Sequence, residues 1–273
     1  MEKLRAKVNA KINLSLSITG KVGSMHTLDS LMHSIGLFDT VTMSGNGNGV
    51  YMNGELDTRN SVNKVLDMMQ ECDLPRVRFD IQKGIPFSAG LGGSSADMSA
   101  AVELVRQSFG VDLPEIELGS DVPFMTRGGF ARVTGIGDKI ERLEPIELHL
   151  VIAKGRGGVN TRDAYALFDK DQTVEKCDNT ALIQALYDKN FEKARENLKN
   201  DLQNPAFLLN PEVKRVYEQM RKCTPYALMS GSGSSVFGIF DPETSAKKTV
   251  ELLRDKNTYA VYTTTKNTGV EIQ

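Results

Sequence analysis

Residues 86–96 combine small residues with hydroxyl groups, a composition suited to binding a polyphosphate. The stretch reads Pro-Phe-Ser-Ala-Gly-Leu-Gly-Gly-Ser-Ser-Ala and runs into a segment with helical periodicity. Glycines let the backbone turn tightly and approach a ligand closely, and a helix start adds free N–H groups and the positive end of its dipole. The stretch lacks the Gly-Lys-Ser/Thr end of a Walker loop and the spacing of a dinucleotide-binding loop. It predicts phosphate binding, with an ordinary flexible loop before a helix as the alternative.

Three further segments carry polar groups of chemical interest. Lys11 and Asn13 lie two residues apart, so they share one face of a predicted strand. Asp121 lies in the turn-forming segment 119–123, and residues 229–237 form a second loop of small residues. Taken alone, each segment has a structural explanation: a solvated strand face, a helix cap or turn, and a hairpin. Their combination with the glycine-rich stretch favours a functional site.

The predicted strands and helices that must position these segments do not alternate regularly along the chain. Apolar residues recur with a period of two in the predicted strands and of about 3.6 in the predicted helices. Strands and helices without regular β–α–β alternation indicate an α+β fold rather than a doubly wound parallel sheet. A boundary is expected near residues 145–155. The predicted strands cover residues 4–18, 40–43, 77–81, 148–153, 226–229, 235–240 and 259–264, and the predicted helices cover 61–72, 94–109, 161–168, 180–188, 191–198, 212–222 and 245–255.

The composition of the 273-residue chain is that of an ordinary globular protein, with 40% hydrophobic and 25% charged residues. A net charge of −2 provides no global field toward nucleic acid or an anionic membrane, so neither partner is expected. The widely spaced Cys72, Cys177 and Cys223 fit neither a disulfide framework nor a metal-binding pair. Unpaired thiols, together with the lack of a signal-peptide pattern or an 18-residue apolar run, predict a cytoplasmic protein.

These segments resemble the three motifs of the GHMP kinases, a family named for galactokinase, homoserine, mevalonate and phosphomevalonate kinases. Their order and rough spacing match over nearly the whole chain. Within the family, the resemblance is strongest to the members that phosphorylate the 2-hydroxyl of 4-diphosphocytidyl-2-C-methyl-D-erythritol in non-mevalonate isoprenoid biosynthesis. The segments that carry this closer match are residues 10–14, 18–21, 26–28, 119–123, 158–161 and 200–202.

The resemblance implies an α+β GHMP kinase fold and ATP as the phosphate donor. A ribosomal protein S5 domain 2-like domain would cover residues 1–150 and a ferredoxin-like domain residues 151–273, with the site between them. Mg²⁺ is expected to sit mainly on phosphate oxygens, with Ser95 as the candidate protein ligand. Asn60 and Lys83 match adenine-side contacts of the family, although Asn60 equally suits a helix cap. The expected ATP-binding residues are Pro86, Ala89, Gly90, Leu91, Gly92, Gly93, Ser94, Ser95, Ala96, Asn60 and Lys83.

The resemblance also assigns catalytic and acceptor-binding roles. Asp121 matches the carboxylate that takes the proton from the attacking alcohol, and Lys11 matches the lysine that stabilises this carboxylate and orients the hydroxyl. On the acceptor side, His26 matches a histidine that hydrogen-bonds the cytosine, and Tyr165 matches an aromatic residue that stacks on it. Met25 stands where the family has a tyrosine, and a thioether covers a base less strongly than an aromatic ring. The expected substrate-binding residues are Asn13, Met25, His26, Thr161, Tyr165, Gly231 and Ser232.

Two departures from the family pattern leave other functions open. Met25 is one, and the other is the short connection over residues 111–118, which lies beside Asp121 in the sequence. Both affect the acceptor side, so the alternative acceptor is another sugar, polyol or isoprenoid alcohol. A nucleotide-binding regulatory protein without turnover is a third hypothesis, which the presence of both Lys11 and Asp121 disfavours. We expect a small-molecule substrate and a monomer or homodimer, with His33 and His149 in structural roles.

Overall fold

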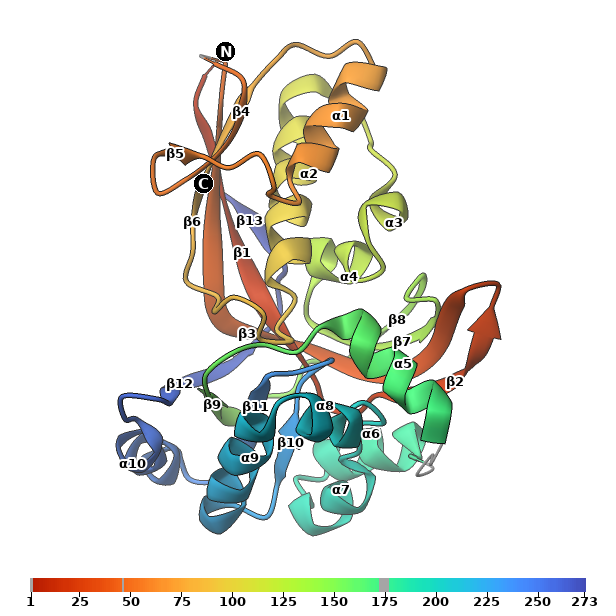
Figure 1. The fold of residues 1–273 in the computed structure, drawn as a ribbon, viewed down its shortest axis with the longest axis vertical. Coiled ribbons are helices and arrows are strands. Elements are labelled where there is room, and N and C mark those ends of the chain that lie inside the picture. Colours follow the sequence, from red (N-terminus) through yellow and green to blue (C-terminus); the bar gives the residue numbers. More distant parts are fainter. Residues whose placement is uncertain (1, 46, 172–176) are drawn as a thin grey trace.

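The computed structural model describes residues 2–45, 47–171 and 177–273. The molecule is elongated, and Figure 1 shows one half built from the first strands and helices α1–α4, and another half that holds helices α5–α10. Both chain ends lie in the first half, because the final strand returns to it. The segments that carry the candidate site residues lie where the two halves meet.

The first half is organised around the strand β3 (Met25–Ser44), which is twenty residues long. It pairs antiparallel with β1 (Leu4–Asn13) along the whole length of β1, with a register shift between Asn9 and Ala10. It also pairs with β2 (Ser17–Val22), β6 (Arg78–Gln82) and β7 (Phe130–Gly135). The smaller strands at the margins are β4 (Gly49–Met52), β5 (Glu55–Leu56), β8 (Lys139–Leu143) and β13 (Val270–Ile272).

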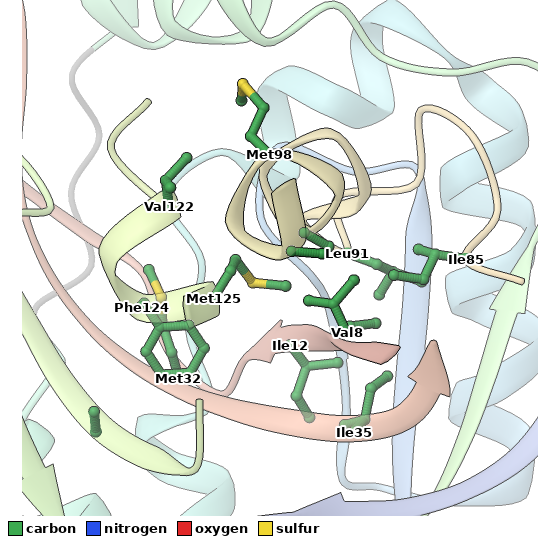
Figure 2. Close-up of a cluster of buried hydrophobic side chains, with 14 of the residues drawn as sticks. Val8, Ile12, Met32, Ile35, Ile85, Leu91, Met98, Val122, Phe124 and Met125 are labelled. Carbon is green, nitrogen blue, oxygen red and sulfur yellow. The ribbon is translucent and has the colours of Figure 1, made fainter. Parts of the chain in front are cut away.

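One face of this sheet is covered by α2 (Gly93–Phe109), which begins directly after the glycine-rich stretch. Figure 2 shows apolar side chains between this helix, α4 (Val122–Arg127) and the strands β1 and β3, among them Ile12, Leu91 and Met125, all at most 1% exposed. This packing fixes the start of α2 and the start of α4 against the end of β1. The remaining helices of this half are α1 (Asn63–Glu71) and α3 (Glu115–Leu118).

The second half has the strand order β10-β11-β9-β12, with all neighbours antiparallel. Its last strand also pairs with β3 through Thr265 and Lys266, so the sheet is continuous between the halves. The strands are β9 (His149–Lys154), β10 (Ala227–Met229), β11 (Ser235–Phe240) and β12 (Tyr259–Lys266). The helices are α5 (Thr161–Asp171), α6 (Asn179–Tyr187), α7 (Phe191–Asn197), α8 (Gln203–Leu209), α9 (Pro211–Cys223) and α10 (Glu243–Leu253).

The pairing pattern confirms the α+β prediction. Among the pairings of named strands in the described residues, only β4 with β6 is parallel. The division of the chain near residue 150 stays a prediction. No helix within residues 2–45, 47–171 and 177–273 has the length and apolar character needed to cross a membrane.

One sequence-based prediction about the first strand was wrong, and one alternative explanation for its polar residues is excluded. The expected strand over residues 4–18 ends at Asn13, and a second strand begins at Ser17. The polar face that Lys11 and Asn13 share is not solvated: their exposed fractions are 4% and 0%. The glycine-rich stretch covers this polar face. The Leu91 carbonyl of the stretch accepts a hydrogen bond from the Lys11 backbone N–H at 3.0 Å.

His33 is a buried structural residue of β3. Its side chain is fully buried and stacks on Phe130 of the neighbouring strand, with 5.1 Å between the ring centroids. Burial lowers the pKa of His33 from 6.5 to about 4, because the charged imidazolium loses its hydration. The neutral ring therefore contributes stability above pH 6.5, and this contribution is lost as the pH falls toward 4.

We expect His33→Phe to make the protein less sensitive to acid. The stability of the wild type should fall by about 3 kcal/mol more than that of the variant between pH 7 and pH 4, since a shift of one pKa unit corresponds to about 1.4 kcal/mol. Urea unfolding of both proteins at the two pH values measures this difference. Equal pH dependence in the two proteins would show that His33 does not titrate on unfolding.

Candidate active site

A cleft of about 520 Å³ lies between the two halves of the molecule. Its walls come from the end of β1, the glycine-rich stretch, the start of α4, helix α5 and the loop between β10 and β11. Most of the predicted site residues line it: Lys11, Asn13, Asn60, Lys83, Pro86, Ala89, Gly90, Leu91, Gly92, Gly93, Ser94, Ser95, Asp121, Thr161, Tyr165, Gly231 and Ser232.

The glycine-rich stretch is held against the hairpin of β10 and β11 by one backbone and one side-chain hydrogen bond. The Ser235 N–H donates to the Ala89 carbonyl at 2.9 Å, and the Ser230 hydroxyl donates to the Gly90 carbonyl at 2.9 Å. A Cβ on Gly90 would lie 2.1 Å from the Ser230 carbonyl oxygen, so only glycine permits this approach. The stretch therefore connects the two halves of the molecule at the cleft.

The start of α2 provides backbone amides that no side chain caps. Gly92 is the residue before the helix, with a left-handed backbone (φ +75°) and without a capping side chain. The first intrahelical bond is donated by the Ala96 N–H to the Gly92 carbonyl at 2.8 Å. Gly93, Ser94 and Ser95 line the cleft at this helix start, where free N–H groups and the helix dipole favour an anion. Ala96 differs from its neighbours, because it is fully buried and lies outside the lining.

Lys11 and Asp121 form an ion pair inside the cleft. The Lys11 Nζ lies 3.2 Å from Asp121 Oδ2, and it also donates to Asn13 Oδ1 at 2.5 Å. Asn13 in turn donates to the Ser30 hydroxyl at 2.8 Å, so the lysine is held by a buried chain of partners. The Lys11 side chain is only 5% exposed, whereas Asp121 is 27% exposed and remains accessible to a ligand. This arrangement leaves a carboxylate, held by an ammonium, in the same cleft as the uncapped backbone amides at the start of α2.

Lys83 lines the cleft, but its ammonium group is already paired with two buried carboxylates. It contacts Asp39 and lies 2.8 Å from Asp97, and the second oxygen of Asp39 accepts from the backbone N–H groups of Gly84 and Ile85. Burial opposes the charged form of Lys83, but Asp97 and Asp39 outweigh it and raise the pKa. Burial also raises the pKa of Asp97, to about 7, against the effect of Lys83. These contacts favour a role in bracing the start of the glycine-rich stretch.

The opposite wall is formed by α5 and the loop after β10. The hydroxyl groups of Thr161 and Ser232 lie 2.8 Å apart across the two elements. Tyr165 is one turn further along α5, and burial raises its pKa to about 12, with a contribution from the charge of Asp121. The phenol of Tyr165 is therefore close enough to the Asp121 carboxylate to be affected by its charge.

Met25 and His26 are the two predicted substrate-binding residues that do not line the cleft. Met25 is 47% exposed at the start of β3. The His26 ring stacks on Tyr165, with 4.4 Å between centroids, and its Nε2 lies 2.8 Å from Asp169 Oδ1. His26 thus contacts Tyr165, which lines the cleft, without lining the cleft itself. Met25 lies outside the site in this structure.

Several cleft residues were missed by sequence reasoning. Arg59, next to Asn60, adds a cation, and Phe87 adds an aromatic ring that is 62% exposed. Two features of the sequence could have identified these residues. Arg59 is a cation beside a predicted contact, and Phe87 is an aromatic residue within the glycine-rich stretch. Asp57, Ser61, Asp97 and Ser120 also line the cleft.

The chain is similar to known proteins over most of its length. The model described as GHMP kinases N terminal domain matches residues 60–129, and the model GHMP kinases C terminal matches residues 182–257. The chain is 32% identical over 270 residues to 4-diphosphocytidyl-2-C-methyl-D-erythritol kinase of Clostridium botulinum (strain Eklund 17B / Type B), covering 93% of this chain and 96% of that protein. It is 35% identical over 276 residues to the protein of the same name from Desulfitobacterium hafniense (strain Y51), covering 95% of each.

Solved structures give the same picture. A crystal structure of 4-(cytidine 5'-diphospho)-2C-methyl-D-erythritol kinase superimposes with a TM-score of 0.81 and 26% identity, over 96% of this chain and 99% of that one. Homoserine kinase from Cytophaga hutchinsonii superimposes with a TM-score of 0.73 at 16% identity, over 100% and 98% of the two chains, which shows a shared fold.

Proposed function

Because the chain belongs to the GHMP kinases, phosphotransferases that use ATP, we propose that its acceptor is 4-diphosphocytidyl-2-C-methyl-D-erythritol, phosphorylated on the 2-hydroxyl. The relatives that carry this name are similar over more than nine tenths of the chain. The observation that supports phosphotransfer is the Lys11–Asp121 pair, 3.2 Å apart in the same cleft as the helix start at Gly93.

The phosphates of ATP would bind at the start of α2. Backbone N–H groups at Gly93 and Ser94, together with the helix dipole, neutralise negative charge without a basic surface. This fits a chain whose net charge is −2. In phosphoryl transfer, catalysis consists mostly of positioning and charge stabilisation, which rigid amides supply.

Asp121 would act as the general base. The hydroxyl oxygen of the acceptor attacks the γ-phosphorus, the bond between that phosphorus and the oxygen of ADP breaks, and the hydroxyl proton passes to the carboxylate. Lys11 keeps the carboxylate in place through its own contacts with Asp121 and Asn13. The buried position of the ammonium limits competition from water for this contact.

The residues of the cleft fit a magnesium ion that is carried mainly by the nucleotide. Within the described residues, no group of three histidine, cysteine or acidic side chains is arranged to hold a metal. The hydroxyl of Ser95 at the helix start is a hard oxygen donor of the kind that Mg²⁺ accepts, and Ser95 is our proposed ligand. When bound, the ion would neutralise charge on the phosphate oxygens.

The acceptor would lie against α5 and the loop after β10. Thr161 and Ser232 offer paired hydroxyls, Asn13 and Gly231 border the ion pair, and Tyr165 offers a ring for a base. The unpaired cysteines support a reducing compartment, so we propose that the enzyme works in the cytoplasm, as a monomer or homodimer.

The acceptor assignment is tested by measuring ADP release with a panel of alcohols. We expect the cytidylated erythritol to give turnover far above buffer, and sugars, polyols and isoprenoid alcohols to give little. Met25, which lies outside the cleft, is the specific reason to include other acceptors. Turnover with another alcohol and none with the cytidylated compound would overturn this acceptor while keeping the kinase activity.

A further inference from the structure

Residues 200–202 lie beside the segment that joins β1 to β2. The Leu16 N–H donates to the Lys199 carbonyl, and the Asp201 N–H donates to the Leu16 carbonyl, both at 2.9 Å. These two hydrogen bonds flank Asn200, which forms an isolated parallel bridge with Leu16. The backbone that carries the Asn200 side chain is therefore anchored to the first half of the molecule.

Both N–H groups of the Asn200 side chain are used by backbone carbonyls of the loop after β10. The Nδ2 atom donates to the Met229 carbonyl and to the Gly231 carbonyl, both at 2.8 Å. The Oδ1 atom accepts from the Leu202 N–H at 2.9 Å. Two acceptors and one donor surround the amide, so only one of its two orientations satisfies all three partners. Asn200 is 8% exposed, so water is a poor substitute for these contacts.

The contact with Gly231 fixes the direction of the peptide group between Gly231 and Ser232. This peptide is trans, and in a trans peptide the C=O and N–H groups point in opposite directions. The Gly231 carbonyl points to Asn200, so the Ser232 N–H points away from Asn200. Among the residues that the structure describes, no acceptor is hydrogen-bonded to this N–H. Gly231 and Ser232 line the cleft, whereas Asn200 does not.

The same peptide lies next to the groups that hold the catalytic ion pair. A Cβ on Gly231 would lie 3.5 Å from Asn13 Oδ1, the atom to which Lys11 Nζ donates. The Ser232 hydroxyl lies 2.8 Å from the hydroxyl of Thr161. The Ser232 N–H thus belongs to the wall of the cleft that we assign to the acceptor.

We propose that Asn200 is a positioning residue, which keeps the Ser232 N–H available to donate to an oxygen atom of the acceptor. The inference rests on the proposed function, because it concerns how that acceptor is held. Gly231 has no Cβ and a φ of +56°, so the chain offers little steric resistance to rotation of this peptide. The hydrogen bond from Asn200 selects the orientation in which the carbonyl is buried and the N–H is free.

The variant Asn200→Asp tests the direction of the peptide without substrate. Aspartate is nearly isosteric with asparagine, but its carboxylate only accepts hydrogen bonds. It should repel the Gly231 carbonyl and attract the Ser232 N–H, so that the peptide turns over. A crystal structure of the variant at about pH 8.5, well above the ordinary aspartate pKa of about 3.9, shows the result. A Gly231 carbonyl that still points to residue 200 would overturn the proposal.

The kinetic consequence is measured separately for the two substrates. In Asn200→Asp, we expect kcat/KM for the acceptor to fall at least about tenfold, the loss of roughly one hydrogen bond, and KM for ATP to change less than about twofold. Asn200→Ala removes the donor without attracting the N–H, so the acceptor kcat/KM should fall less than in Asn200→Asp. If the aspartate variant does not fold, the alanine variant alone carries the comparison of acceptor with ATP.

The matched control is Asn190→Asp. Asn190 is exposed, caps α7 through its side-chain oxygen and does not line the cleft. Aspartate caps a helix as well as asparagine does, so this variant should keep wild-type kinetics. Equal losses toward acceptor and ATP in the Asn200 variants would mean that Asn200 is merely structural, and the inference fails.

The failure of the proposed acceptor would look different. A wild type that does not phosphorylate the cytidylated compound refutes that acceptor, and the kinetic comparison is then made with the alcohol that gives ADP release. The crystal structure of the substrate-free Asn200→Asp variant tests the peptide direction whichever alcohol is the acceptor. A turned peptide with an unchanged acceptor kcat/KM would refute the role of the Ser232 N–H.

Discussion

Replacing Asp121 with asparagine is expected to lower kcat by about a thousandfold, within the usual range for removing a general base. The amide cannot accept the proton of the attacking alcohol, although it occupies nearly the same space. ATP binding should change little, because the proposed phosphate contacts are backbone groups at the start of α2. Single-turnover kinetics and ATP titration of the variant measure the two quantities separately.

The control for this variant is Asp112→Asn. Asp112 is 80% exposed on the short connection after α2 and does not line the cleft. The Asp112→Asn variant makes the same chemical change outside the cleft and should keep the wild-type kcat. If Asp121→Asn retained more than about a tenth of wild-type turnover, Asp121 would lose its role as general base, since such a loss is below the usual range.

Replacing Gly90 with alanine is expected to separate the glycine-rich stretch from the second half of the molecule. The added Cβ would lie 2.1 Å from the Ser230 carbonyl oxygen and 2.8 Å from that of Gly233. These are backbone atoms, so the loops must move apart, and the φ of +71° adds strain. We expect the free energy of unfolding to fall by about 3 kcal/mol and ATP affinity to fall at least about tenfold.

Gly110→Ala is the matched control for backbone strain. Gly110 has a φ of +67°, close to that of Gly90, but a Cβ there would meet nothing within 4 Å. Only the strain cost of about 1–2 kcal/mol is expected, without an effect on ATP affinity. Urea unfolding and calorimetric ATP titration of both variants test this. Equal behaviour of the two would show that the contact with Ser230 does not hold the nucleotide site.

The short-range patterns of the sequence were sufficient for the α+β class, which the pairing pattern and the related structures confirm. They were insufficient for β3, of which only residues 40–43 were predicted as a strand. Ser30, His33 and Ser34 of this strand are all buried. Polar residues that are buried between neighbouring strands hide the alternation on which strand prediction depends. Only the partners across the sheet show why they are tolerated.

The candidate site was predictable where a motif is local. The glycine-rich stretch and the start of α2 lie in one segment, so their proximity follows from the sequence. The contacts of Lys83 do not follow from the sequence in this way. Asp39 lies 44 residues away in the chain, and nothing in the sequence indicates that it would reach the lysine. The same holds for the stacking of His26 on Tyr165, which depends on the docking of a hairpin on α5.

The most direct test of the phosphotransfer proposal is a crystal structure of the enzyme with a non-hydrolysable ATP analogue and the cytidylated erythritol. We expect the 2-hydroxyl oxygen to lie within hydrogen-bond distance of the Asp121 carboxylate and in line with the γ-phosphorus, as phosphoryl transfer requires. The triphosphate should contact the backbone at Gly93 and Ser94. A γ-phosphate bound far from Asp121, with the hydroxyl directed at another group, would contradict the account.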